Sequence, residues 1–111
     1  MDYHVAKEEV DAYHRDGAVP LRGVVDGDWL KLLEAGIERD ISEPGPFVHG
    51  YVPDNGIGKF YGNIRIWEND PEMGRFCTSG PLVSLAAQFF ESSKVNLFYD
   101  QLFVKEPGTE N

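Results

Sequence analysis

The feature that most constrains the fold is a long apolar run near the C-terminal end, KVNLFYDQLFVKEPG at residues 94–108. Its aromatic and branched residues favour a β-strand, and Pro107-Gly108 predicts a turn at its end. Alternate residues of a strand share a face. One predicted face carries Leu97, Tyr99, Gln101 and Phe103; the other carries Phe98, Asp100, Leu102 and Val104. Because both faces are apolar, we expect both to be covered.

The length and charge of the chain limit its class. A chain of 111 residues with 41% hydrophobic residues fits one domain over residues 1–111. The formal net charge of −9 would repel a phosphate backbone, so we expect no nucleic-acid partner. A single cysteine, an N-terminus without an apolar leader and no apolar stretch of about 20 residues predict a cytoplasmic protein with no membrane partner.

Helical patterns recur along the sequence. Residues 5–17 predict a short helix that ends at Gly17, and residues 26–42 predict a longer one with Asp26 or Asp28 as its N-cap. Residues 70–80 predict a short helix or turn, and residues 80–93 predict another helix. The expected buried stripes are Leu30, Leu33, Ile37 and Ile41 in the second helix, and Leu82, Leu85, Ala86 and Phe89 in the last.

The remaining segments predict strands and a loop. Residues 59–70 read as a strand, and residues 18–26 as a short edge strand interrupted by Pro20. Residues 43–58 are rich in proline and glycine and predict a long loop. The fold class is therefore α+β, with N-terminal helices packed on a few mostly antiparallel strands. One face of the strand at 59–70 would carry Tyr61, Asn63, Arg65 and Trp67.

Several short motifs resemble metal-binding or catalytic motifs, but the elements in which they lie do not suit that function. His14 and Asp16 have a metal-ligand spacing, but positions two apart on a helix point in different directions. His4, His14 and His49 lie in unrelated segments, and Cys77 is expected to be a small buried side chain. Gln101 is more informative, because a mid-strand amide between apolar neighbours needs a partner. Its partner could be the protein interior or a ligand, and both readings stay open.

Three segments are similar, in order, to one enzyme family. FYDQLFVKEPGTEN resembles the segment that precedes the metal site in the phytanoyl-CoA dioxygenase family. YHRDGAVPLRGVVDGDWLKLLEAGIERDI resembles the opening helix–strand–helix of that family, and WENDPEMGRFCTSGPLVSLAAQFFESSKVNLFYDQLFVKEPGT resembles its helix before the first long strand. The resemblance covers essentially the whole chain, and VKEPGT is its most specific part.

The resemblance implies an iron(II), 2-oxoglutarate-dependent oxygenase with a double-stranded β-helix, or jelly-roll, core. In that family a His-x-Asp segment and a distant histidine bind the iron, and they follow a stretch like VKEPGTEN. Residues 1–111 would then be the N-terminal part of such an enzyme, truncated before the iron-binding motif. We expect no catalytic or metal-binding residue in this chain, no cofactor bound to it alone, and no activity by itself.

Carrying the family pattern onto this sequence gives five candidate residues. Tyr99, Gln101 and Arg65 would contact 2-oxoglutarate, and Asn63 and Trp67 would contact a small-molecule substrate. The loop at residues 43–58 would help to close the pocket as a lid.

A second reading needs no enzyme. The chain could be a free-standing binding or assembly module that pairs its last strand with another chain, because exposed strand edges recruit further strands. Either reading predicts a partner at that edge, which is a second copy of the chain or the remainder of an oxygenase. An unrelated α+β domain is the third possibility.

Overall fold

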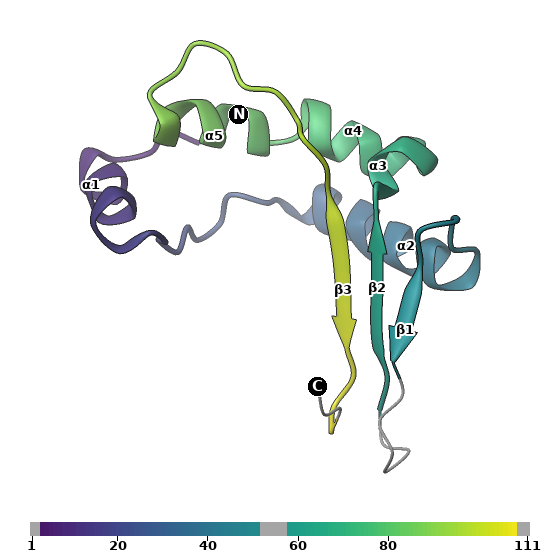
Figure 1. Cartoon of the computed structure of the whole chain (residues 1–111). Helices are drawn as coiled ribbons and strands as arrows, with labels where there is room; N and C mark the ends of the chain where they lie inside the picture. The colour runs from purple at the N-terminus through teal and green to yellow at the C-terminus, as the bar shows by residue number, and fades with distance from the viewer. Residues whose placement is uncertain (1–2, 52–57, 109–111) are drawn as a thin grey trace.

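The computed structural model describes residues 3–51 and 58–108, which form helices and an antiparallel sheet (Figure 1). The α+β class predicted from the sequence is confirmed. Within the described residues, no helix combines the length and the apolar composition that a membrane span requires. In chain order the elements are α1 Lys7–Asp16, α2 Gly27–Ser42, β1 His49–Tyr51, β2 Phe60–Ile64, α3 Ile66–Asn69, α4 Pro71–Ser79, α5 Leu82–Phe90 and β3 Gln101–Lys105.

Two helix ends follow the local sequence as predicted. Gly17 has a φ of 80° and donates its N–H to the carbonyl of Tyr13, which closes α1 in the left-handed conformation that glycine tolerates. The Asp26 carboxylate accepts the N–H of Trp29 at 2.9 Å and caps the start of α2. Both ends depend on contacts within one helical turn, which is why the sequence predicts them.

The sheet has the order β1-β2-β3 with antiparallel pairing throughout. Gly62 lies opposite Phe103, so the two faces of the β2–β3 pair can be assigned from the register. The helix-facing side packs towards α2 and carries Tyr61, Asn63, Leu102 and Val104. The open side carries Phe60, Ile64, Gln101, Phe103 and Lys105.

Both predicted long strands are wrong in length. β3 begins only at Gln101, and residues 94–100 approach it without regular structure. We also expected both faces of this strand to be covered. Among the described residues, the open side lacks this cover, because Phe103 on it is 55% exposed. β2 stops at Ile64, because Arg65 takes a left-handed φ of 61° and α3 starts at the next residue.

Two other segments differ from the sequence predictions. Residues 18–26 contain no strand; Val19, Leu21 and Val24 instead pack on a cluster of Val5, Leu85 and Phe89 between α1 and α5. Within residues 43–58, which predict an uninterrupted loop, His49–Tyr51 form β1, and residues 52–57 lie outside the described residues.

The buried stripes are only partly as predicted. In α2 the buried residues are Leu32, Gly36 and Asp40, whereas Leu30 is 55% exposed. This face is buried because Gly36 leaves room for the buried Met73 of α4, where a Cβ would collide with the Met73 thioether. In α5 Leu85 and Phe89 are buried as expected, but Leu82 is exposed.

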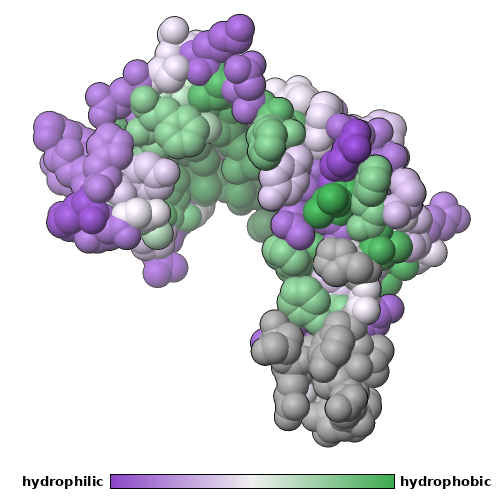
Figure 2. All heavy atoms as spheres, viewed as in Figure 1, coloured by the Kyte–Doolittle hydropathy of each residue, from purple (hydrophilic) through white to green (hydrophobic). Residues whose placement is uncertain are grey.

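The elements form an arch rather than a sphere (Figures 1 and 2). One end is the helix pair of α1 and α5; the other is the sheet lobe of α2, α3, α4 and the sheet. The radius of gyration is 16.2 Å, against about 13 Å for a compact domain of this length. The accessible surface is 7823 Å², against roughly 6,200 Å² for a compact monomer of this mass. Figure 2 shows hydrophobic atoms along the inner side of the arch.

Candidate functional site

Four of the five candidate residues lie around the junction where β2 ends and β3 begins. Ile64 is the register partner of Gln101, and the N–H of Arg65 donates to the Asp100 carbonyl at 3.0 Å. Two residues later, the N–H of Trp67 donates to the Asp100 carboxylate oxygens at 3.1 and 3.3 Å. The junction is thus organised by Asp100, which the sequence analysis did not select.

Asp100 is a half-buried carboxylate that accepts hydrogen bonds from other segments of the chain. Besides the Trp67 N–H, the Cys77 thiol donates to it over 3.9 Å. Burial raises the pKa of the Asp100 carboxyl, because desolvation penalises its charged form. Within the described residues it forms no ion pair. The sequence signal that could have indicated it is the single acid inside the apolar run FYDQLF.

Trp67 lies in α3, not in a strand with Asn63 as predicted. Its indole Nε1 is buried and has no hydrogen-bond acceptor within the described part of the chain. A buried donor without an acceptor is costly, so a polar group from elsewhere would stabilise it. The junction therefore contains an unpaired donor and a carboxylate without a cation.

The guanidinium of Arg65 already forms an ion pair with a neighbouring residue, Glu68. Its Nη2 and Nε lie 2.7 and 2.8 Å from Glu68 Oε2, and its guanidinium lies 4.9 Å from the centre of the Phe47 ring. A carboxylate ligand such as 2-oxoglutarate would have to compete with Glu68 for this guanidinium. The predicted cofactor contact of Arg65 remains a prediction.

Tyr99 and Gln101 are both exposed but do not share one strand face, because Tyr99 precedes β3. Tyr99 lines an apolar hollow of about 410 Å³ between α5 and residues 95–100. Gln101 lies on the open side of the sheet, so it is not the buried amide that the sequence suggests. Their predicted contacts with 2-oxoglutarate are not tested by these positions.

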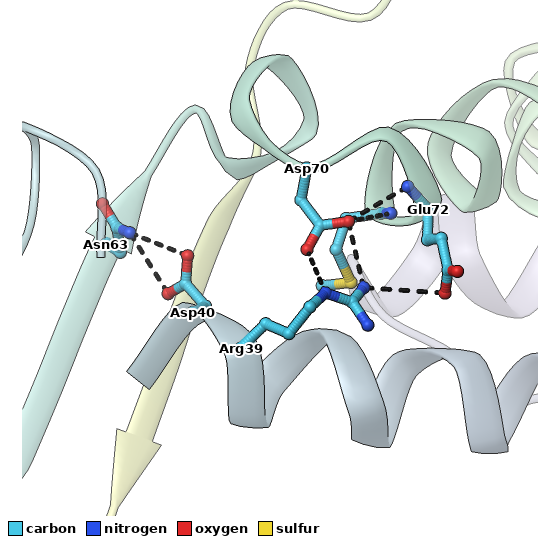
Figure 3. Close-up of polar contacts among 6 residues, drawn as sticks. Arg39, Asp40, Asn63, Asp70 and Glu72 are labelled. Atoms are coloured by element: carbon cyan, nitrogen blue, oxygen red, sulfur yellow. Dashed lines mark hydrogen bonds and ion pairs between the residues drawn. The ribbon is translucent and has the colours of Figure 1, made fainter. Parts of the chain in front are cut away.

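Asn63 lies on the helix-facing side, away from the other candidates, and only 2% of it is exposed. Its Nδ2 donates to both Asp40 carboxylate oxygens, at 2.9 and 3.1 Å (Figure 3). The Tyr61 hydroxyl donates to the same carboxylate at 2.7 Å. Burial, and then the bond to Asp40, raises the pKa of Tyr61 to about 12. This cluster of Asp40, Tyr61 and Asn63 anchors α2 to β2.

A second polar cluster joins α2 to α4 (Figure 3). Arg39 forms a two-pronged pair with the Asp70 carboxylate, at 2.9 and 3.0 Å, and its Nη2 lies 3.6 Å from Glu72. Asp70 also accepts the N–H groups of Glu72 and Met73 at the start of α4. The hydrogen bond from Arg39, first of all, lowers the pKa of Asp70. This cluster borders a hollow of about 520 Å³. The charge of Arg39 is paired with those of Asp70 and Glu72 across the contact between α2 and α4.

The iron implied by the family resemblance does not fit the described residues. Within residues 3–51 and 58–108, no three His, Cys, Asp or Glu side chains come together as a possible metal site. A mononuclear iron centre of the oxygenase type needs two histidines and a carboxylate on one face. The ligands of such a centre would have to come from other residues.

Comparisons with known proteins do not assign the chain to a family. No family model matches it, and neither a curated protein nor a solved structure does.

Proposed function

We propose that this chain is the N-terminal, structural part of an iron(II)- and 2-oxoglutarate-dependent dioxygenase of the phytanoyl-CoA dioxygenase type. Further strands would extend the sheet outward from β3 and cover its open side. The described residues would supply the helical cover and the first strands of a jelly-roll core, and they would not supply the iron ligands. A small-molecule substrate would bind in the completed domain.

The observation that carries this proposal is the exposed side and edge of β3. The strand is last in the sheet, so its outer backbone groups have no strand partner among the described residues. Phe103 on its open side is exposed, and Phe98 just before it is 89% exposed. An edge of this kind recruits another strand. Antiparallel sheets commonly leave one face in water when that face is polar, whereas the open side here carries Phe60, Ile64 and Phe103.

The size of the exposed surface favours extensive cover. The accessible area of 7823 Å² exceeds the compact expectation by roughly 1,600 Å². One partner in a standard interface contributes about 800 Å². Completion of a domain removes more surface than a standard dimer contact, which favours the oxygenase reading over simple pairing.

The alternative is an assembly module whose β3 pairs with β3 of a second copy. The unpaired edge favours it, but two chains with a net charge of −9 each repel one another. Light scattering across a concentration series distinguishes the two. A stable dimer at twice 12.5 kDa supports the module, and a monomer contradicts it.

The direct test is the coding sequence on the 3′ side of the Asn111 codon, combined with the intact mass of the protein from its natural source. The oxygenase proposal expects an open reading frame with a His-x-Asp motif soon after VKEPGTEN and a further histidine later. The complete protein should then consume 2-oxoglutarate with iron(II), whereas the 111-residue chain should not. A stop codon immediately after Asn111 would contradict the oxygenase proposal.

A further inference from the structure

The hollow beside Asp100 has the size and lining of a small-molecule site. Its volume is about 410 Å³, within the range of 300 to 1,000 Å³ that is common for ligand pockets. The apolar walls come from α5 and from the segment that follows it in the chain. α5 contributes Leu82, Val83, Ala86 and Phe90, and the segment before β3 contributes Val95, Leu97 and Tyr99.

The polar groups of the hollow come from Cys77, Thr78, Asn96 and Asp100. Of these four residues, only Asp100 has a carboxyl group, which becomes negatively charged when it loses its proton. The Trp67 N–H donates to both oxygens and the Cys77 thiol donates to Oδ2, so the acceptor position that these bonds leave is on Oδ1, because a carboxylate can accept about four hydrogen bonds.

Among the described residues, no lysine, arginine or histidine forms an ion pair with Asp100. Arg65, whose backbone N–H binds the Asp100 carbonyl, turns its guanidinium to Glu68. The other described ion pairs do not include Asp100. Burial disfavours the charged form of this carboxyl and raises its pKa, so a cation supplied by a ligand would relieve the desolvation cost.

We propose that this hollow binds a small amphipathic cation, with its ammonium group on the Asp100 carboxylate and its aliphatic or aromatic body along α5. Apolar walls with one uncompensated carboxylate complement a ligand that has one compact charge and an apolar tail. An anionic ligand is disfavoured by the same carboxylate. This inference does not rest on the proposed oxygenase function.

The test compares three probes of equal length: hexylamine, 1-hexanol and hexanoate. Binding is followed by amide chemical shifts at neutral pH. Hexylamine should bind at least about tenfold more tightly than hexanoate, a difference of about 1.4 kcal/mol. The shifts should concentrate at residues 82–90 and 95–100. Equal binding of the three probes, or shifts spread over the whole chain, would overturn the proposal.

Variants identify the group responsible. Asp100→Asn should weaken hexylamine binding by about tenfold and leave 1-hexanol within about twofold. Asp28→Asn makes the same change at an exposed position of α2 and should leave both probes unchanged. Unaltered hexylamine affinity in Asp100→Asn would refute the role of this carboxylate.

Asp100 also accepts the N–H of Trp67, so its variant could unfold. Val83→Lys tests the same idea with Asp100 intact, because Val83 is an exposed wall residue. The added ammonium should compete for the carboxylate, weaken hexylamine about fivefold and strengthen hexanoate. If this folded variant binds hexylamine as the unaltered protein does, the proposal fails.

Discussion

The two sides of the same sheet are built very differently. On the helix-facing side, Tyr61 and Asn63 both donate to Asp40, and Leu102 and Val104 are half-buried beside them. On the open side, Phe103 is exposed and no described element covers it. The comparison shows two different roles. The helix-facing side stabilises the fold by holding α2 to the sheet, whereas the open side leaves apolar surface available for contact with further chain or a partner.

The same contrast appears in the charged residues. Arg39 and Asp70 form a two-pronged pair between α2 and α4, so their charges stabilise the fold. Asp100 lies at the edge of an apolar hollow and forms no ion pair among the described residues. Asp70 therefore stabilises the fold through a cation, and Asp40 does so through hydrogen bonds from Tyr61 and Asn63. We propose that Asp100, at the edge of the hollow, serves a ligand instead.

The largest effect is expected from Asn63→Asp. The change places a second carboxylate against Asp40 in a buried site, where two like charges lack a cation. We expect a loss of at least about 3 kcal/mol in the free energy of unfolding. Urea denaturation at pH 7 measures it. Asn96→Asp, the same change at an exposed position, should stay within about 0.5 kcal/mol. Similar values for both variants would contradict a buried Asp40–Asn63 pair.

A phenylalanine pair compares the core with the open surface. Phe89→Ala removes a ring buried in the cluster between α1 and α5 and should cost about 3 kcal/mol. Phe98→Ala removes an exposed ring and should change stability by less than about 0.5 kcal/mol. Denaturation curves give both values. A large loss in Phe98→Ala would mean that the ring is already packed in solution, for example against a second copy.

Asp70→Ala removes both the α4 cap and the pair with Arg39. The cap contributes about 1 kcal/mol, and the pair adds less because water screens the half-exposed guanidinium. We therefore expect a loss of about 1.5 kcal/mol at pH 7.

This difference should depend on pH. The folded-state pKa of Asp70 lies below its ordinary value of 3.8, so its contribution is present above that value and is lost as the pH falls through the folded-state pKa. The stabilities of the two proteins should converge below about pH 4. A constant difference down to pH 2 would exclude the ion pair as its source.

The smallest effect is expected from Tyr61→Phe, which removes one hydroxyl and should cost about 1 kcal/mol at pH 8. Tyr61 keeps its proton in the folded state up to a pKa of about 12, against an ordinary value of 10.0. Its contribution is therefore full below pH 10 and is lost as the pH rises through 12. The unaltered protein should lose more stability between pH 9 and 11.5 than the variant does. Parallel pH profiles would show that the hydroxyl is not held in this way.

Local chemistry allowed part of the fold to be predicted. Asp26 and Gly17 define helix ends through bonds within one turn, and the alternation of Leu102 and Val104 with Phe103 follows from strand geometry. The stripe of α2 was misplaced because Gly36 and Asp40 are not apolar. Their burial depends on Met73 and Asn63, which come from elements that the helix pattern does not identify.

The candidate site shows the same division. Sequence patterns alone predicted the α+β class, the helices α1, α2, α4 and α5, the core residues Leu85 and Phe89, and an apolar last strand, but they placed α3 inside a strand. Only the tertiary structure decided that Arg65 turns out of the sheet and that Asp100 meets Trp67, a residue 33 positions away. The physical reason is that capping and strand patterns arise from neighbours along the chain. The cost of burying a carboxylate, in contrast, depends on which distant groups surround it.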